Sequence, residues 1–243
     1  MLRAALFAMV GLFAGTASAT PPNVILKAEF IEPTGRYDHA ILGDDVEWGA
    51  MRVTFDACAG CQDSIIMDRV IRLPETRVFE DLEPRIIRDE HNLTVIMVVE
   101  THLELGARLA IYTADRLYTA TPFIGRSHRW LAPVGAADLD GDGIPEIAYV
   151  EKPHLSKELK IWRFEEDGLT FVTSLAGLTN HRIGEDFISG GIRDCGDGPE
   201  MITADAGWQN IMATKFDGKR LTTRRIGTFK GQPSMKSAMS CKF

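Results

Sequence analysis

After residue 19 the sequence contains no segment apolar enough to span a membrane, and it has no low-complexity tract. With 45% hydrophobic and 25% charged residues, the chain can bury a core, so we expect an ordered protein. Basic residues are not in excess, because the formal net charge is -7. An acidic surface argues against nucleic acid and anionic lipid as partners. The sequence also lacks a nucleophile elbow, a phosphate-binding glycine loop and a metalloprotease motif.

The longest apolar run lies at the N-terminus. Arg3 precedes an apolar stretch over residues 4–14, and small residues end the segment at 17–19. The stretch is too short to cross a bilayer, so residues 1–19 are typical of a secretory signal peptide; a buried N-terminal helix is the alternative. No cysteine follows the cleavage site, which argues against a lipid anchor there. We therefore expect a periplasmic or secreted protein whose single domain is 20–243.

Cysteine is scarce, with four residues in the chain. In an exported protein these indicate disulfides rather than reduced thiols. Cys58 and Cys61 bracket an expected hairpin tip, which favours a structural disulfide over a redox pair, because redox pairs of this spacing open a helix. A zinc site would need two more ligands. Cys195 and Cys241 then form the natural second pair; cross-pairing with Cys58 or Cys61, or free thiols, are the alternatives.

The sequence repeats itself. Residues 78–89 and 183–194 are identical at five of twelve positions without a gap, and residues 130–138 form a shorter relative. Each segment is followed by three short runs rich in Val, Ile, Thr and aromatic residues, which predict strands. The runs cover 93–100, 108–113 and 116–123, then 146–151, 159–164 and 169–174, then 200–205, 210–216 and 221–226. An earlier, degenerate unit has runs at 48–55 and 64–73.

Four strands in a unit of about 50 residues are typical of a β-propeller blade. We therefore predict an all-β fold, a small β-propeller of about four four-stranded blades. The blades are expected near 24–72, 77–123, 128–175 and 182–227. The tail, 228–243, is expected to pair with the N-terminal strands and close the ring. A β-sandwich or an open array of the same strands is the alternative.

One turn between two expected strands has the pattern of a calcium-binding loop. Positions 1, 3, 5, 7 and 9 are Asp138, Asp140, Asp142, Ile144 and Glu146. Alternating carboxylates around a glycine at position 6, with the carbonyl of position 7, surround one hard cation with oxygens, so calcium is the expected cofactor. The loop is not an EF-hand, because Tyr149 stands at position 12 and strands flank the loop. Without a metal the aspartates would repel one another; a metal-free cluster of Asx turns is the alternative.

This Asp-x-Asp-Gly-Asp-Gly-x-x-Glu loop, in repeats of blade length, resembles the FG-GAP/VCBS repeats of integrin-α-like β-propellers. The full motif occurs once, and 194–200 and 89–93 are shortened copies. The resemblance implies that 130–138 is an inner strand and 146–151 its neighbour, with the metal loop on the face away from the connections between blades. Members of this group serve as adhesion, ligand-binding or scaffold modules, and some are attached to enzymes, so the resemblance implies fold and calcium more than function.

The start of each repeat also carries polar residues that a propeller would gather about its axis. They are Arg77, Glu80 and Asp81, then His128, Arg129 and Trp130, then His181, Arg182, Glu185 and Asp186. Such a set can bind a polar or anionic ligand or perform acid–base catalysis; ion pairs that lock neighbouring blades are the structural alternative.

We favour a non-catalytic, calcium-binding module that binds or scaffolds an unknown protein or glycan of the bacterial envelope. The alternative is a propeller-fold hydrolase or lyase that uses the residues at the start of each repeat. A funnel-shaped pocket in which His128 or His181 faces Glu185 or Asp186 would favour the enzyme.

Overall fold

The computed structural model describes residues 23–88 and 94–242. The predicted signal peptide, 1–19, and the shortened loop at 89–93 lie outside the described residues. Within the described ranges the chain forms 17 strands and one helix, and none of its helices is long and apolar enough to cross a membrane. The elements are β1 (Val24–Thr34), β2 (Glu47–Asp56), β3 (Ile66–Arg72), β4 (Arg77–Phe79), β5 (Arg85–Arg88), β6 (Thr94–His102), β7 (Gly106–Tyr112), β8 (Leu117–Ala120), β9 (Leu131–Ala137), β10 (Glu146–Glu151), β11 (Glu158–Glu165), β12 (Gly168–Ala176), β13 (Leu178–Thr179), β14 (Gly191–Asp194), β15 (Pro199–Asp205), β16 (Asn210–Phe216), β17 (Leu221–Thr228) and α1 (Gln232–Met239).

The strands form three antiparallel sheets, none of which is closed, so the prediction of an all-β protein is confirmed. Sheet A contains β1–β8, sheet B contains β9–β12 and sheet C contains β13–β17. Three successive stretches are four-stranded meanders, in which each strand pairs with the next: β5–β8, β9–β12 and β14–β17. The first stretch has three strands, β1–β3, rather than the expected four, and β4 joins it to the next by pairing with both β2 and β6.

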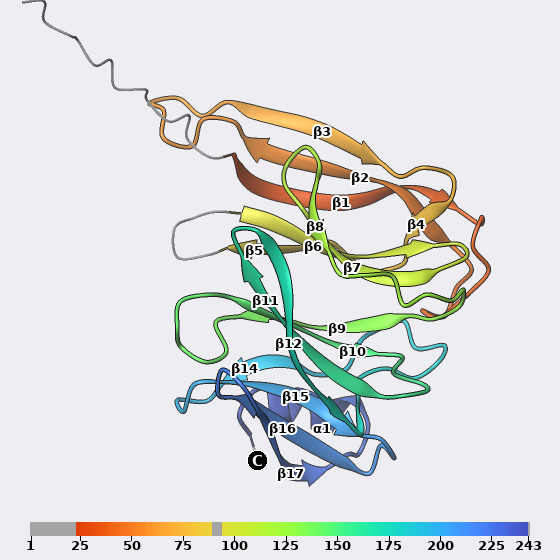
Figure 1. Ribbon diagram of the computed structural model, residues 1–243, viewed down its shortest axis with the longest axis vertical. Helices are drawn as coiled ribbons and strands as arrows, with labels where there is room; N and C mark the ends of the chain where they lie inside the picture. The colour runs from red at the N-terminus through yellow and green to blue at the C-terminus, as the bar shows by residue number, and fades with distance from the viewer. Residues whose placement is uncertain (1–22, 89–93, 243) are drawn as a thin grey trace, which may run out of the picture.

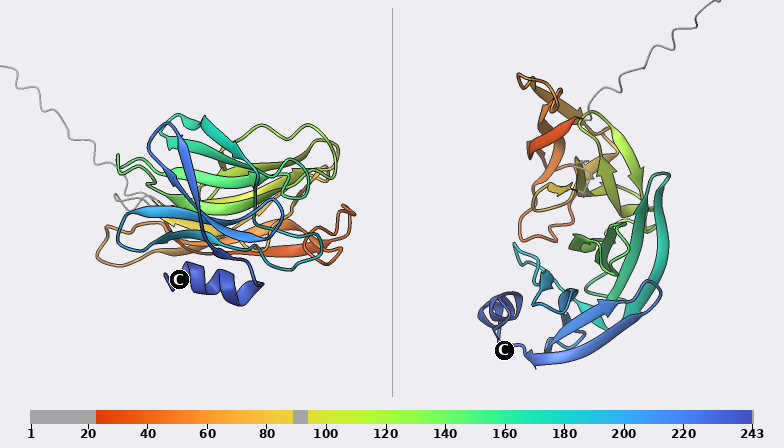
Figure 2. Two further views of the ribbon diagram at one scale, coloured as in Figure 1. Left: turned by 90° about the horizontal axis from the view of Figure 1, so that it is seen from below. Right: turned by 90° about the vertical axis from the view of Figure 1, so that its left-hand side faces the viewer.

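These stretches stack face to face as layers. Successive side chains of a strand point to opposite faces of its meander, so each meander can pack apolar side chains against a neighbour on either side. Sheet A folds back so that β1 and β2 pack against β6 and β7; β6 and β7 also pack against β9 and β10, and β9–β11 pack against sheet C. The side chains at the three interfaces include Met51 and Val98, then Leu109 and Ile147, then Ile161 and Met201. The stack runs from β1–β3 at one end to β17 and α1 at the other (Figure 1), and it bends into an open arc (Figure 2).

The C-terminal tail does not pair with the N-terminal strands, so the expectation that it closes a ring is wrong. Gln232–Met239 is the helix α1, which packs on its own sheet against β14 and β17 and buries Met235 and Ala238. The segment has no β-branched residue, and Pro233 lies in the first turn, where its missing N–H is tolerated; both features favour a helix over a strand. The helix lies at the opposite end of the stack from β1 (Figure 1).

Both predicted disulfides are confirmed. Cys58 and Cys61 are bonded in the turn between β2 and β3, with 5.4 Å between their Cα atoms. Cys195, between β14 and β15, is bonded to Cys241, which follows α1, with a Cα separation of 5.8 Å. No cysteine is free. The second disulfide therefore anchors the helix to sheet C, rather than joining the two ends of a ring as expected.

We predict that the double variant Cys195→Ser/Cys241→Ser loses about 3–4 kcal/mol of unfolding free energy in the chain-entropy description of cross-links. The reason is that this bond spans 46 residues of sequence, whereas Cys58–Cys61 spans 3. The matched variant Cys58→Ser/Cys61→Ser should lose clearly less. Urea denaturation of the oxidised proteins measures both, and an equal loss in the two variants would contradict the anchoring role of the long-range bond.

Candidate functional site

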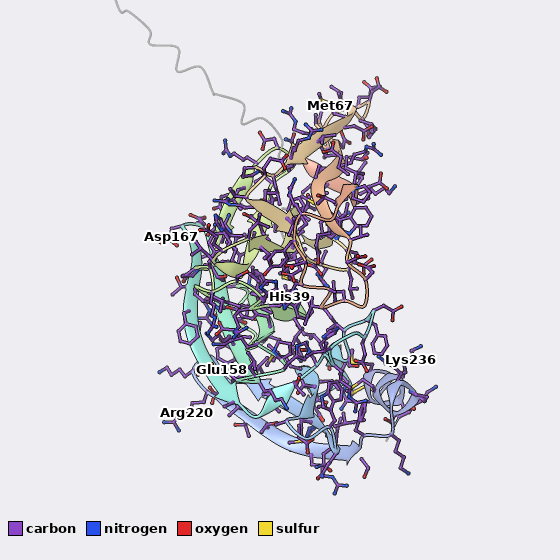
Figure 3. All side chains as sticks on the ribbon, turned by 90° about the vertical axis from the view of Figure 1, so that its right-hand side faces the viewer. His39, Met67, Glu158, Asp167, Arg220 and Lys236 are labelled. Carbon is purple, nitrogen blue, oxygen red and sulfur yellow. A yellow bond between two sulfur atoms is a disulfide. The ribbon has the colours of Figure 1, made fainter. Side chains whose placement is uncertain are left out.

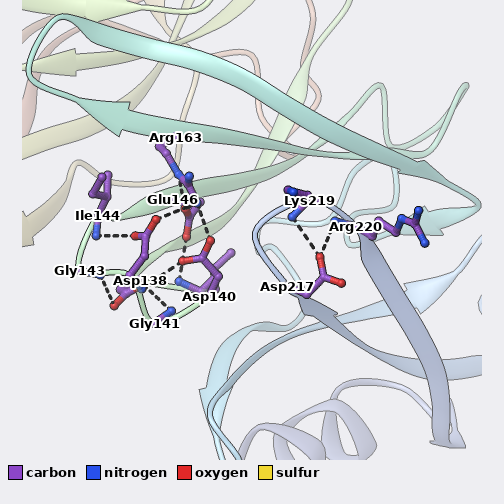
Figure 4. Close-up of polar contacts among 12 residues, drawn as sticks. Asp138, Asp140, Gly141, Gly143, Ile144, Glu146, Arg163, Asp217, Lys219 and Arg220 are labelled. Carbon is purple, nitrogen blue, oxygen red and sulfur yellow. Dashed lines mark hydrogen bonds and ion pairs between the residues drawn. The ribbon is translucent and has the colours of Figure 1, made fainter.

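The predicted calcium loop connects β9 to β10. Ala137, the last residue of β9, pairs with Glu146, the first residue of β10, and the intervening chain reverses through Gly141 and Gly143, whose φ values are 82° and 88°. Both glycine N–H groups donate to the carboxylate of Asp138, at 2.7 and 3.0 Å (Figure 4). These left-handed glycines let the loop wrap around Asp138, which is why the motif needs glycine there.

Three carboxylates converge in this loop. Asp138, Asp140 and Glu146 each offer an oxygen, and these oxygens lie within 4.8 Å of one another. Glu146 is completely buried, whereas Asp142 lies outside the group of three with 39% of its side chain exposed. The N–H of Ile144 donates to Asp142 Oδ1 at 2.8 Å. The structure thus brings together three of the five predicted ligands and places the other two beside them in the same loop.

Arg163 faces the same carboxylates from β11. Its Nη2 atom lies 2.5 Å from Asp140 Oδ2, 2.7 Å from Glu146 Oε1 and 3.3 Å from Asp142 Oδ2. The sequence analysis did not find this residue. Arg163 stands opposite Glu146 in the β10–β11 ladder, so the register of that hairpin is the signal that would have identified it.

The formal charges of the loop do not balance. The loop has four carboxylates, and Arg163, which contacts three of them, offsets one charge, so the formal net charge is -3. Burial raises the pKa of Glu146, and the hydrogen bonds from the Leu139 N–H and Arg163 oppose that rise. Oxygen donors carrying excess negative charge are what a hard divalent cation such as calcium prefers. The donor set therefore fits calcium.

The shortened loop at 194–200 is balanced differently. Its glutamate, Glu200, is also buried, and it accepts bonds from two arginines, Arg193 at 2.5 Å and Arg224 at 2.9 Å. The loop has three carboxylates, and the two guanidinium groups at Glu200 offset two of their charges, so the formal net charge is -1. Arginines offset most of the charge here, so this loop has less need of a cation than the loop at 138–146.

A hairpin of sheet C packs directly against the candidate metal loop. A side chain at Gly218, in the turn between β16 and β17, would place its Cβ 2.8 Å from Asp140 Oδ2. Gly218 has a φ of 87°, and the carboxylate of the preceding Asp217 accepts the N–H groups of Lys219 and Arg220 (Figure 4). The loop therefore lies at the boundary between sheets B and C, where a bound cation would brace both.

The predicted ligand-binding residues divide into two groups. His128, Arg129 and Trp130 line one pocket, and His181 contacts its lining residue His154. Glu80 lies behind the same pocket, bonded to His39. The remaining five serve the structure or face solvent instead, which agrees with the structural alternative. Arg77 pairs with Glu100, Asp81 with Arg85, Arg182 stacks on Trp208, the side chain of Glu185 accepts the Arg182 N–H, and Asp186 is exposed.

The sequence analysis missed three further polar residues of that pocket, His39, Lys152 and His154. His39 lies in the connection between β1 and β2, outside the repeated segments, so no motif marked it. Lys152 and His154 lie in the connection between β10 and β11, where no repeat or motif marks them.

Comparisons with known protein families, with curated protein sequences and with solved structures found no match for this chain.

We predict that Arg163→Gln makes the protein more dependent on calcium. In chelator the variant should melt well below the unchanged protein, because the buried Glu146 and its neighbours lose a charged partner. Calcium should restore much of that loss by supplying positive charge at the same carboxylates. The control is Arg193→Gln at the shortened loop, whose loss should be the same with and without calcium. A deficit of Arg163→Gln that calcium leaves unchanged would contradict a cation at this loop.

Proposed function

We propose that the chain is an exported, calcium-stabilised β-propeller-type module that binds a protein or glycan of the bacterial envelope without catalysing a reaction. The observation that carries the proposal is the convergence of Asp138, Asp140 and Glu146 with more negative charge than Arg163 balances. Calcium at this loop would hold the β9–β10 turn in one conformation and keep it against the hairpin of sheet C.

The stacking of the layers supports a propeller-type arrangement. Successive four-stranded meanders pack face to face along an arc, and the candidate metal loop joins the first two strands of its meander, β9 and β10. In the FG-GAP/VCBS pattern the calcium loop occupies this place. An open array of the same layers is the alternative architecture, and it would serve a binding role through the same loops.

Two further features support export. Both disulfides belong to a class of bond that persists in oxidising compartments and is rare in the cytosol. A structural calcium loop is useful where calcium is abundant, as it is outside the cytosol. Together they support a periplasmic or secreted location.

A hydrolase or lyase was expected to place His128 or His181 opposite the carboxylate of Glu185 or Asp186, and the structure has a different arrangement. His128 Nε2 contacts Asp38 at 2.9 Å, and His181 Nε2 contacts the backbone carbonyl of Glu185 rather than its carboxylate. Neither histidine therefore faces Glu185 or Asp186 as an acid–base pair. This difference favours the binding role over the enzymatic one.

We predict that calcium raises the melting temperature of the protein by about 5–10 °C. A ligand that binds the native state alone adds about 2.7 kcal/mol at a hundredfold excess over its Kd, and about 1 kcal/mol corresponds to roughly 2–4 °C in a chain of this length. Differential scanning calorimetry in calcium and in chelator measures the shift. Asp140→Asn should abolish it, because Asp140 is one of the three converging carboxylates.

The matched control is Asp197→Asn in the shortened loop, which should keep the full calcium response. Magnesium should be less effective than calcium, because it requires near-ideal octahedral geometry and gives up its water reluctantly. Equal melting temperatures in calcium and chelator would refute the proposal.

A further inference from the structure

A pocket of about 270 Å³ lies where connections from all three sheets meet. Its lining comes from the β1–β2 connection (His39, Ile41), the β8–β9 connection (His128–Trp130), the β10–β11 connection (Lys152–Leu155) and the β13–β14 connection (Ile183). His39 lies in the middle of the arc, far from Lys236 on α1 (Figure 3). Trp130 directly precedes β9 and Lys152 directly follows β10, so the pocket lies at the opposite end of this hairpin from the candidate metal loop.

Positive charge faces this pocket, and its lining contains no aspartate or glutamate. Arg129 makes no ion pair with another described residue, and Lys152 is paired only with the adjacent Glu151, at 3.1 Å. Carboxylates just outside the lining contact three of its basic side chains, since Glu151 pairs with Lys152, Asp38 with His128 and Glu80 with His39, so Arg129 is the lining residue whose charge no described carboxylate offsets. A guanidinium without a carboxylate partner beside a concave site can hold an anion through charge-assisted hydrogen bonds.

Two residues of the lining have a strained backbone. His128 and Lys152 have φ values of 56° and 47°, in the left-handed region that non-glycine residues seldom occupy. Hydrogen bonds hold them there: the His128 N–H donates to the hydroxyl of Tyr37 at 2.7 Å, and the Lys152 N–H donates to the carbonyl of Trp130 at 2.9 Å. Backbone strain that the surroundings maintain is concentrated at ligand-binding sites.

Two histidines of the lining are each held by one ring nitrogen. His39 Nδ1 lies 2.5 Å from the fully buried carboxylate of Glu80. His154 Nε2 lies 3.0 Å from Nδ1 of His181, whose Nε2 donates to the carbonyl of Glu185 at 2.9 Å. Burial lowers the pKa of His154 to about 4, so this ring is neutral at pH 7. Each histidine therefore has a fixed orientation, and His154, which donates its Nε2–H to His181, presents an unprotonated Nδ1 that accepts hydrogen bonds and does not donate them.

Apolar side chains form the floor and the rim of the pocket. Trp130 and Ile41 are buried at its floor. Ile183 and Leu155, which are 71% and 60% exposed, are the two most exposed large apolar side chains in the described part of the chain. Apolar surface left uncovered beside a pocket with few, well-placed polar groups is typical of a small-molecule site.

We propose that this pocket binds a small organic acid, in which a carboxylate is joined to an apolar body. Arg129 and Lys152 hold the carboxylate, and Leu155 and Ile183 cover the apolar body. The proposal goes beyond the protein- or glycan-binding role described above, because it assigns a separate small-molecule site that does not include the calcium loop.

The test uses 3-phenylpropionate as the probe, titrated by calorimetry into the full disulfide-bonded protein in calcium. We expect saturable binding of one molecule per chain. The neutral analogue 3-phenylpropan-1-ol and the short anion acetate should each bind at least about tenfold more weakly, because each lacks one half of the recognition. Equal binding of the alcohol would overturn the anionic recognition, equal binding of acetate would overturn the apolar contact, and no binding of the probe would overturn the proposal.

Two variants locate the site. Lys152→Gln and Arg129→Gln should each weaken binding of 3-phenylpropionate about tenfold or more through loss of a charged hydrogen bond. The matched control Lys236→Gln, exposed on α1, should bind like the unchanged protein. The indole N–H of Trp130, which donates to the carbonyl of Glu80 at 2.9 Å, should shift in the NMR spectrum on binding. Full affinity in both folded pocket variants, or an unmoved Trp130 signal, would place binding elsewhere.

Calcium stabilisation and acid binding are measured separately, so the two proposals can fail independently. Folded Asp140→Asn, titrated with 3-phenylpropionate, should still bind the acid, because Asp140 is not in the pocket. If calcium does not stabilise the protein but the acid binds as expected, the calcium account fails and the pocket stands. If calcium stabilises the protein and no acid binds, the pocket assignment fails alone.

Discussion

A formal net charge of -3, gathered at the turn between β9 and β10, is the constraint on which the centre of this molecule depends. Arg163 offsets one charge of the four carboxylates, and the buried Glu146 at the start of β10 cannot move away from the others without breaking its strand. The hairpin of sheet C presses on the same loop through Gly218. A cation at this point would therefore stabilise a turn, a strand end and the contact between two sheets together.

The β9–β10 hairpin links this loop to the rest of the molecule. One end of the hairpin carries the candidate metal loop, and the other end carries Trp130 and Lys152, which line the acid-binding pocket. Between them, the hairpin contributes Leu131 and Ile147 to the core shared with sheet A, and Val134 and Val150 to the core shared with sheet C. The hairpin is thus the central layer on which both neighbouring layers are packed.

An open stack of layers leaves two ends that need cover. At the C-terminal end, α1 places Met235 and Ala238 against sheet C, and the Cys195–Cys241 disulfide ties its end down. At the N-terminal end, β3 keeps Ile66 and Met67 largely exposed. The two ends therefore differ: the helix α1 covers the C-terminal end of the stack, whereas β3 is exposed to solvent at the N-terminal end.

The sequence predicted local features well, because they depend on neighbouring residues. The runs at 146–151 and 210–216 coincide with β10 and β16, and both disulfide pairings are present. The prediction for the C-terminal tail was wrong, because the repeat pattern indicated a strand where Pro233 and the absence of β-branched residues favour a helix. The convergence of Asp138, Asp140 and Glu146 could be predicted, since one turn contains all three.

What the sequence could not provide is the register of strands and the meeting of distant loops. Arg163 reaches Glu146 because the β10–β11 ladder places them opposite each other, which spacing alone does not determine. His39 and His154 enter one pocket from connections that are more than 100 residues apart. Their roles depend on how the layers stack, which follows from packing of the whole chain rather than from any local pattern.

The central claim is that the loop at 138–146 binds one calcium ion, and equilibrium dialysis with radioactive calcium tests it most directly. The account predicts one ion tightly bound per chain at physiological ionic strength, and none tightly bound in Asp140→Asn. A stoichiometry near zero for the unchanged protein, or one ion retained by the folded variant, would contradict it.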